Sequence, residues 1–492
     1  MRKKIRDLNA MHGRLLHAMT KHHRHLVALL LMLLSFLPSH AFRGSRMEAG
    51  REYYLFNIYQ AKFLGSDGTL QAPNVGTPAC FLAGEEGFVI GGIAYKARRN
   101  DAGYYQLVDG DRYLALEEKV PDPLFPRDEN RAMYPGGGVT CLPTPHDTDR
   151  SYWLLIDRQE YREWTEKKKF TIASLNVDGL PRDLKVLGLF KIKLNPDAME
   201  KLGAQAIGQR LRSSGYDVVG VSEDLNFHKY ILKEAQSQPV SYGAMTHRGK
   251  VGVNVRSVAR IAVKKSPLFH TDGLGLFYRK DRVDEQELIR SESWTAWERH
   301  NGYTDQGADG LIAKGFRFYV VRLDDGTEID LYTMHMDAGG GRGDYESRAS
   351  QLAQLARAIK ATDHKRPIVI IGDSNCRYTR DNIKGILVDA LSADSRFTVG
   401  DAWIELARQG RYPRNPSGSL MTWDRGYRQG EVVDKIWYVN HSESPVQIKA
   451  ETYAQDLSFV ASEDIPGTLI RRGAPLCDHK PCVVTFSYTV RP

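Results

Sequence analysis

The stretch "RPIVIIGDSN" (residues 366–375) decides the fold class of this 492-residue chain. Its apolar run, residues 368–371, has the length and the β-branched composition of a buried strand. A carboxylate and an amide follow where the run stops, at Asp373 and Asn375. A long helical pattern over residues 344–362 precedes it. The stretch therefore predicts a strand of a layered α/β structure that ends in polar groups.

The same texture continues from residue 170 to the end of the chain, where short apolar runs alternate with amphipathic stretches. Helices are expected over residues 197–215 and 344–362. Further strands are expected over residues 170–177, 216–223, 273–280, 315–323, 328–337, 431–440 and 480–490. This alternation indicates one large α/β or α+β domain over residues 170–492, with a cleft at the strand ends.

Polar side chains recur where these strands stop or start. They are Asn176, Glu223, His335, Asp337, Asp373, Asn375, Asp434, Asp478 and His479. One such residue alone is usually a turn former or a helix cap. Their repetition indicates a shared site, in which carboxylate and amide oxygens suit a hard cation, Mg²⁺ first, with Mn²⁺ or Ca²⁺ as substitutes. The histidines add proton transfer near neutral pH, so the set favours phosphoester hydrolysis.

The stretch "CDHKPC" (residues 477–482) allows three interpretations: a metal knuckle, a turn closed by a disulfide, or the end of that catalytic set. A zinc knuckle would need four side chains from six residues, two of them adjacent, to converge on one ion. The entry of a strand does not easily allow this, so the catalytic interpretation is favoured.

Six short motifs occur in one order along the chain: "SLNVDGLP", "VGVSEDLNFH", "LYTMHMDAG", "IIGDSN", "VVDKIWY" and "CDHKP". In this order they resemble the endonuclease/exonuclease/phosphatase superfamily, which has the deoxyribonuclease-I-like fold. The resemblance implies a four-layered sandwich with two packed β-sheets. It also implies a Mg²⁺-dependent phosphoric ester hydrolase.

The resemblance assigns roles to these positions. Asn176, Glu223 and Asp478 would lie at the metal, and His335 would contact the scissile phosphate. Asp373 and Asn375 would orient the attacking water and bind phosphate. Asp434 would fix the tautomer of His479, the general acid or base. Separately from the resemblance, Asn226 and His228 follow closely after Glu223 in the sequence and are candidates for contact with the leaving group. The sequence departs from the family at Cys477, where a serine is usual.

The first forty-one residues read as a secretory signal. Met1–Ala41 carries seven Lys or Arg, one Asp and the apolar run "LVALLLMLLSFL", which is too short to span a bilayer comfortably. A membrane anchor is the alternative. Removing the signal takes the net charge from +8 to +2, which leaves no strong electrostatic footprint for nucleic acid. An exported protein, secreted or periplasmic, is expected.

Residues 50–157 read as a small all-β module, β-trefoil-like or a sandwich. Residues 53–64 and 104–116 look like two copies of one hairpin. A carbohydrate- or surface-binding appendage and a structural cap are both open. The charged stretch 158–169 is expected to be a linker. The five cysteines predict disulfides within each half of an exported chain, Cys376–Cys477 or Cys477–Cys482 in the second.

The substrate is expected to be a phosphodiester, either a lipid headgroup or a nucleic acid. Export and a near-neutral charge favour a secreted sphingomyelinase-like enzyme over an endonuclease acting on DNA or RNA. An inositol- or sugar-phosphate phosphatase follows, and then a non-catalytic binding protein with the adhesion-like tripeptide at residues 342–344. Residues 247–265 are a basic loop or a solvated surface, and Trp294 and Trp297 touch a membrane or pack in the core. A monomer is expected.

Overall fold

The computed structural model describes residues 42–71, 77–117, 120–121, 133, 139–142, 148–186, 190–193, 200–237, 242–245, 273–294, 314–413 and 430–491. Within these ranges, no helix is both long and apolar enough to cross a membrane. The predicted signal peptide, the basic stretch 247–265 and Trp297 lie outside them.

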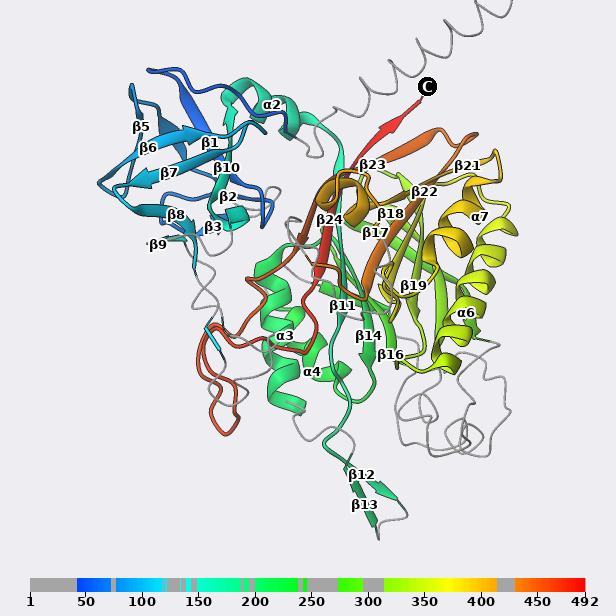
Figure 1. Cartoon of the computed structure of the whole chain (residues 1–492). Helices are drawn as coiled ribbons and strands as arrows, with labels where there is room; N and C mark the ends of the chain where they lie inside the picture. The colour runs from blue at the N-terminus through cyan, green and yellow to red at the C-terminus, as the bar shows by residue number, and fades with distance from the viewer. Residues whose placement is uncertain are drawn as a thin grey trace, which may run out of the picture.

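Two six-stranded sheets form the centre of the second part of the chain (Figure 1). Sheet I has the order β15 (Tyr242–Met245), β16 (Gly273–Arg279), β14 (Val218–Asp224), β11 (Lys169–Asn176), β24 (Cys482–Val490) and β23 (Val446–Gln455). Sheet II has the order β17 (Val283–Ser293), β18 (Gly315–Leu323), β19 (Glu328–His335), β20 (Ile368–Asp373), β22 (Asp434–His441) and β21 (Phe397–Asp401).

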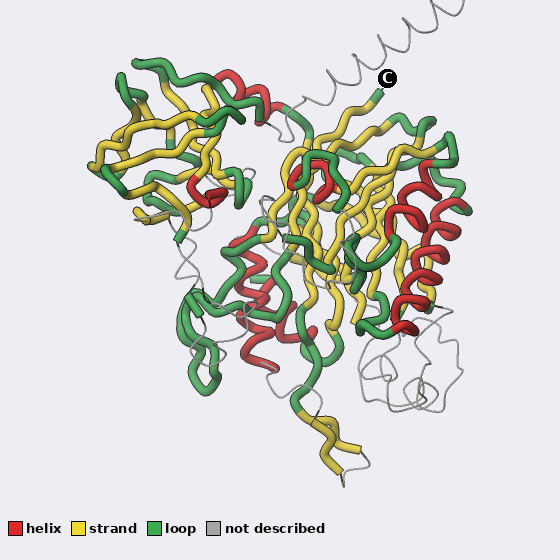
Figure 2. Tube along the Cα trace, viewed as in Figure 1, coloured by secondary structure: helices red, strands yellow, loops and turns green. Residues whose placement is uncertain are grey.

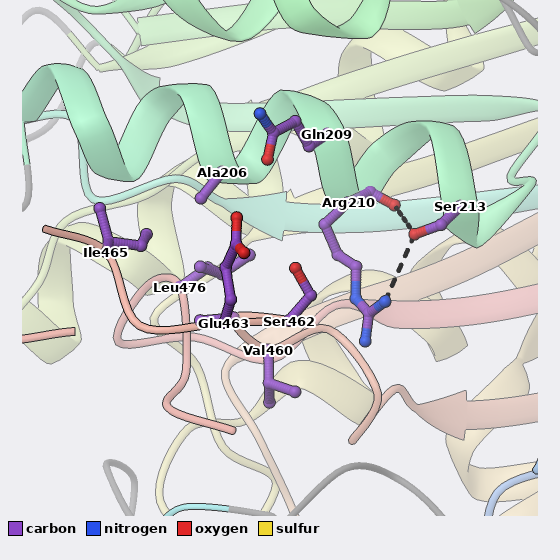
Figure 3. Close-up of a pocket in the computed structure, with 10 residues that line it drawn as sticks. Ala206, Gln209, Arg210, Ser213, Val460, Ser462, Glu463, Ile465 and Leu476 are labelled. Atoms are coloured by element: carbon purple, nitrogen blue, oxygen red, sulfur yellow. Dashed lines mark hydrogen bonds between the residues drawn. The ribbon is translucent and has the colours of Figure 1, made fainter. Parts of the chain in front are cut away.

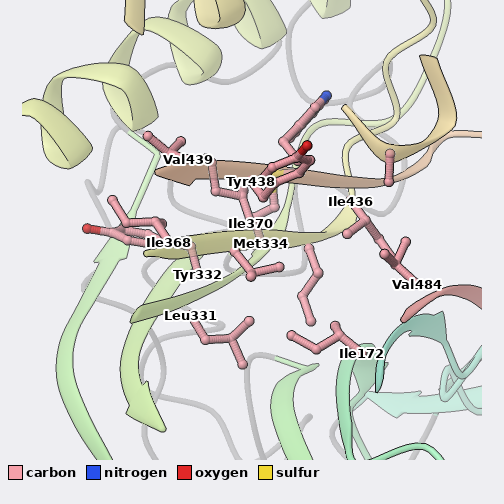
Figure 4. Packing of buried hydrophobic residues seen from close by; sticks show 14 of the residues in the cluster. Ile172, Leu331, Tyr332, Met334, Ile368, Ile370, Ile436, Tyr438, Val439 and Val484 are labelled. Atoms are coloured by element: carbon pink, nitrogen blue, oxygen red, sulfur yellow. The ribbon is translucent and has the colours of Figure 1, made fainter. Parts of the chain in front are cut away.

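The inner faces of the two sheets pack against each other through a large apolar core. Figure 4 shows Ile172 and Val484 of sheet I beside Leu331, Ile370 and Ile436 of sheet II. Successive side chains of a strand point to opposite faces, and this period of two explains the strong apolar content of β11. Ile172 joins the inner core, whereas Ala173 and Leu175 join the cluster on the outer face.

Helices cover the outer faces, so the structure has four layers (Figure 2). Helices α3 (Glu200–Ser214) and α4 (His228–Ala235) pack on sheet I through Ile207, Leu211 and Ile231. Helix α6 (Arg342–Lys360) lies outside sheet II, with α7 (Asp389–Ser392) and the π-helical turn 384–388. The π-helical turn 403–407 contacts β21 of sheet II and β23 of sheet I. This agrees with the sandwich predicted from the sequence.

Most of the predicted strands and helices lie within a few residues of the observed ones. Helix α3 ends at the predicted glycine, since Gly215 has φ +68°, a conformation that glycine adopts without strain. The sequence did not indicate β17, β21 or β23, nor the separate hairpin of β12 (Asp183–Val186) and β13 (Phe190–Lys193).

Ahead of sheet I, the chain forms a ten-stranded antiparallel sheet, the N-terminal sheet. Its strands are β1 (Glu52–Asn57), β2 (Lys62–Leu64), β3 (Leu70–Gln71), β4 (Cys80–Leu82), β5 (Gly87–Ile90), β6 (Ile93–Arg99), β7 (Tyr105–Asp109), β8 (Arg112–Leu116), β9 (Val139–Leu142) and β10 (Tyr152–Asp157), with a 3₁₀ turn at Thr148–Ser151. The two predicted repeats form hairpins β1–β2 and β7–β8. A trefoil-like or sandwich module that binds a glycan or a surface stays a prediction.

The predicted linker is partly helical. Residues 158–166 form α2, whose first turn is capped because Asp157 Oδ1 accepts a hydrogen bond from Glu160 N at 2.8 Å. Its single buried side chain, Trp164, lies against Phe42 with the ring centroids 5.2 Å apart. One buried aromatic residue leaves no apolar stripe, which is why the sequence did not reveal this helix.

Candidate active site

The predicted site residues come from the same edge of both sheets. Asn176, His335 and Asp373 end strands β11, β19 and β20. Asp434 begins β22, and it pairs with Asp373 because β22 runs antiparallel to β20. His479 precedes β24, which runs antiparallel to β11. The ends of some strands and the starts of their antiparallel neighbours therefore meet at one place.

His479 is oriented by a buried carboxylate. Its Nδ1 bonds to Asp434 Oδ2, and Ser174 Oγ donates to the other oxygen of Asp434 at 3.4 Å. His479 keeps 19% of its side chain exposed, against 2% for Asp434. Burial lowers the pKa of His479, but the charges of Asp434 and Asp373 outweigh it and hold that pKa well above its usual value. The ring is therefore protonated near neutral pH.

Asp373 is the hub of the site. Its Oδ2 lies 3.2 Å from Asn176 Nδ2 and 3.8 Å from the Nε2 atoms of both His335 and His479. Its Oδ1 accepts a hydrogen bond from Asn375 N at 2.9 Å. Burial raises the pKa of Asp373, but the interactions with the imidazoles of His479 and His335 lower it by more than burial raises it. The pKa of Asp373 therefore lies below its usual value. Asp373 is therefore ionised, and it lies beside the imidazoles of His335 and His479.

The peptide that precedes Asp373 is packed too tightly for any side chain. A Cβ at Gly372 would lie 2.0 Å from Met334 O, and the residue has φ +143°. This glycine allows β19 and β20 to approach closely, and His335 and Asp373 are paired in the register of these two strands.

Glu223 lies beside His335, with Oε1 3.7 Å from Nε2, and keeps 18% of its side chain exposed. Burial raises the pKa of Glu223 to about 7, and the charges of Asp478 and Asp373 add to the rise, whereas Lys314 opposes it. An ionised Glu223 is thus disfavoured unless more positive charge arrives. The backbone of Glu223 is strained, with φ +58°, as is that of Asn375, with φ +49°. Such strain gathers at functional sites.

These donors fit a hard divalent cation. The carboxylates of Glu223 and Asp478 and the amide of Asn176 are oxygen ligands, and the acidic surroundings of Glu223 would be relieved by a cation. The exposed Asp478 lies within electrostatic reach of Glu223. Among the described residues, no group of three or more His, Cys, Asp or Glu side chains is already arranged to hold an ion. The metal role of the three therefore stays a prediction.

Sequence reasoning missed one charged residue of the site. Lys314, 3% exposed, donates from Nζ to Met336 O at 3.0 Å. Its charge lowers the pKa values of Glu223 and Asp373. The available signal was its position directly before strand β18, at the edge where the other polar residues gather. A single lysine before a strand is usually exposed to solvent, so the sequence alone does not mark Lys314 as a residue of the site.

Asn375 and His228 have defined contacts at the border of the site. Asn375 Nδ2 donates to Met336 O at 3.1 Å, beside the strand end that carries His335. His228 begins α4 and bonds through Nδ1 to Asp224 Oδ2 at 2.5 Å, with its ring against Phe277. Asn226 is half-buried in the loop between Asp224 and His228. Contact of Asn226 and His228 with a leaving group stays a prediction.

The predicted disulfides are absent, because all five cysteines are free thiols. Cys376 and Cys482 belong to the large apolar cluster that includes the inner faces of the sheets, whereas Cys477 lies in the cluster under α3. Cys477 Sγ instead donates to His479 O at 3.1 Å. The short separation of Cys477 and Cys482 along the chain therefore does not bring them together, because the chain passes between two layers.

Two other features of the sequence have structural explanations. Trp294 is fully buried and donates from Nε1 to His335 O at 2.6 Å, so it packs in the core and supports the site. The tripeptide 342–344 lies in the first turn of α6, where Gly343 is buried and Asp344 Oδ2 accepts a hydrogen bond from Gly341 N at 2.7 Å. Asp344 is therefore a capping residue in the first turn of α6, which begins two residues before the predicted range.

No family model matches the chain. Sphingomyelinases of Mycobacterium bovis and Mycobacterium tuberculosis are 25% identical to it over 325 residues, which cover 65% of this chain and 53% of the relatives. The chain thus spans about half the length of these relatives. Among solved structures, beta toxin from Staphylococcus aureus aligns at 15% identity and a TM-score of 0.39, over 64% of this chain and 99% of its own. TDP2 of D. rerio, complexed with a single-strand DNA product, aligns at 18% and 0.37, over 65% and 99%. Such TM-scores do not bear on the substrate.

Proposed function

We propose that the chain from residue 170 onward is a member of the endonuclease/exonuclease/phosphatase superfamily and a metal-dependent phosphodiesterase that hydrolyses sphingomyelin. The observation that carries the proposal is the convergence of Asp373, His335 and the His479–Asp434 pair at one edge of the two sheets. The choice of sphingomyelin rests on the name of the mycobacterial relatives.

In the proposed reaction, water attacks phosphorus in line with the oxygen that leaves. The Nε2 of His479 and the Oδ2 of Asp373 are 3.8 Å apart, too far for a direct hydrogen bond. An oxygen atom of water or phosphate can therefore contact both. Asp373 and Asn375 orient this oxygen. His479, which starts protonated, gives its proton to the oxygen that leaves, and the ring then takes up the proton that the attacking water loses. His335 contacts the phosphoryl oxygens and stabilises the charge that develops on them.

Glu223, Asn176 and Asp478 would hold the cation, with Mg²⁺ proposed first and Mn²⁺ or Ca²⁺ as substitutes. When bound, such an ion supplies Lewis-acid neutralisation of a phosphoryl oxygen. For sphingomyelin, the P–O bond on the lipid side breaks. Water supplies the hydroxyl of the released phosphocholine, and the lipid oxygen takes up a proton to give ceramide.

The direct test is the release of phosphocholine from sphingomyelin vesicles by the chain without residues 1–41. With Mg²⁺ we expect release, and with EDTA we expect release to fall to background and to return when Mg²⁺ is added in excess. Release that is indifferent to EDTA would contradict the role of the metal. If a folded protein releases no phosphocholine but cuts DNA or RNA in a chelator-sensitive way, the nuclease alternative replaces the sphingomyelinase.

Export to the periplasm or the medium is also part of the proposal. Support comes from Phe42, which directly follows the predicted signal and is completely buried against Phe56, Phe63 and Trp164. A chain cut after Ala41 would keep this contact. We expect the full-length chain, expressed in a Gram-negative host, to appear in the periplasm or the medium with an N-terminus near Phe42. Recovery of an uncleaved chain in the membrane fraction would favour the anchor.

A further inference from the structure

The segment that carries His479 leaves sheet I after β23 and returns to it at β24. It runs from residue 456 to 481 without a helix or strand of more than one residue. Its two ends meet at what we call the base of the segment, where Gln455 pairs with Cys482 and Asp456 N donates to Pro481 O at 2.8 Å. Pro481 is two residues beyond His479. The position of Asp456 therefore bears directly on the position of the catalytic imidazole.

Gln60, in the turn between β1 and β2 of the N-terminal sheet, and Lys62, at the start of β2, contact this base. Gln60 donates from Nε2 to Gln455 O at 3.1 Å and accepts from Leu457 N at 3.0 Å. Lys62 Nζ lies 2.8 Å from Asp456 Oδ1 and 2.9 Å from Ser458 Oγ. These groups are removed from water, since Asp456 is 1% exposed and the side chain of Lys62 13%. A buried pair of this kind defines one geometry.

Apolar contacts accompany the polar ones. Ala454 of β23 belongs to a cluster made mainly of the N-terminal sheet and α2, which includes Phe56, Phe63 and Trp164. Tyr59, from the β1–β2 turn, packs with Leu457 and Val460. The N-terminal sheet and the base of the His479 segment therefore share continuous packing. A domain attached only through a flexible linker would not share such packing.

Farther along, the same segment is packed less closely. A cavity of about 240 Å³ lies between α3 and residues 460–476 (Figure 3). Arg210 and Ser213 of α3 line it on one side, and Ser462 and Glu463 line it on the other. The apolar side chains of Phe459, Ala461 and Leu476 nevertheless pack in one cluster with those of α3. The base, at Asp456 and Pro481, is where the N-terminal sheet contacts the segment.

We propose that the N-terminal sheet positions the catalytic histidine: Gln60 and Lys62 hold residues 455–458 against Pro481 and thereby fix the place of His479. This inference rests on the proposed role of His479 in hydrolysis. It makes the N-terminal sheet an integral part of the active unit, with Lys62 and Gln60 as positioning residues that do not touch substrate. A misplacement of about 1 Å can cost about a hundredfold in rate.

The test compares Lys62→Met with Lys168→Met in the full mature chain. Lys168 also pairs with an aspartate, Asp325, at 2.8 Å, but its side chain is 56% exposed and it contacts the turn between β18 and β19. For Lys62→Met we expect kcat to fall about tenfold or more, with KM within twofold. For Lys168→Met we expect no change in either. A fall in kcat matched by an equal loss of folded protein in near-UV circular dichroism would overturn the proposal.

Hydrogen exchange gives a readout that needs no substrate. Amides of residues 477–482 should exchange faster in Lys62→Met, and those of strands β19 and β20 should not. Gln60→Ala, which leaves no buried charge without its partner, should give the same pattern and serves if Lys62→Met does not fold. Wild-type kcat and wild-type exchange in Gln60→Ala would overturn the proposal. If the wild type hydrolyses no phosphodiester, the proposed function fails, and exchange alone decides the positioning.

Discussion

Replacing His479 with alanine is expected to lower kcat for phosphodiester hydrolysis by about 10³-fold, within the range for removal of a general acid or base. The reason is its position, with Nδ1 bonded to buried Asp434 and Nε2 directed to Asp373. Because the imidazole is the group that exchanges the proton, KM should change little. The measurement is steady-state hydrolysis with saturating Mg²⁺.

His364→Ala is the matched control. His364 also pairs with a buried aspartate, Asp330, at 3.4 Å, but that residue lies beside the start of β20, at the other end of sheet II. Activity of His364→Ala should stay within about twofold of the wild type. A His479→Ala enzyme that keeps more than a tenth of the wild-type kcat would remove the assignment of His479 as acid or base.

Replacing Glu223 with glutamine should abolish metal-dependent activity and at the same time stabilise the metal-free protein. The folded carboxyl keeps its proton up to about pH 7, whereas in the unfolded chain it ionises near pH 4.3. Between these values the folded state binds more protons, so the carboxyl lowers the free energy of unfolding as the pH rises. A neutral amide removes this loss, which amounts to at most about 3.7 kcal/mol at pH 8.

Urea unfolding in EDTA measures this gain, which should shrink to a few tenths of a kcal/mol near pH 4.5. Glu405→Gln is the control, because burial raises the pKa of Glu405 to about 7 as well. Glu405 bonds to Tyr438 Oη at 2.8 Å, away from the site. It should show a similar gain in stability but keep full activity and the Mg²⁺-induced rise in Tm. Loss of that rise in Glu405→Gln, or its survival in Glu223→Gln, would contradict the metal role of Glu223.

The sequence predicted the parts of the site that follow apolar strands. Asn176, His335 and Asp373 each end a run whose period and composition are plain, and the two-sheet fold brings such ends together. The convergence of Asp434 and His479 was predicted only through the resemblance of their motifs, since nothing local indicates which strands run antiparallel. The catalytic roles themselves stay predictions.

What the sequence missed depends on contacts between distant segments. The burial of Lys314 results from the meeting of β18 with the end of β19, and no local pattern shows it. The cysteines predicted bridges because their spacing along the chain is short, yet the chain crosses from one core cluster to the other between Cys477 and Cys482. Helix α2 depends on one tryptophan that packs on residues more than a hundred positions earlier.

The position of β24 in sheet I has a consequence for the synthesis of the chain. This last strand lies between β11 and β23, and His479 comes just before it. Chains leave the ribosome from the N-terminus, and their early parts fold first. Until β24 emerges, the nascent chain has a gap between β11 and β23 in sheet I and lacks His479 of the candidate site. The open edges of β11 and β23 therefore need protection from aggregation until β24 has been synthesised and has paired with both strands.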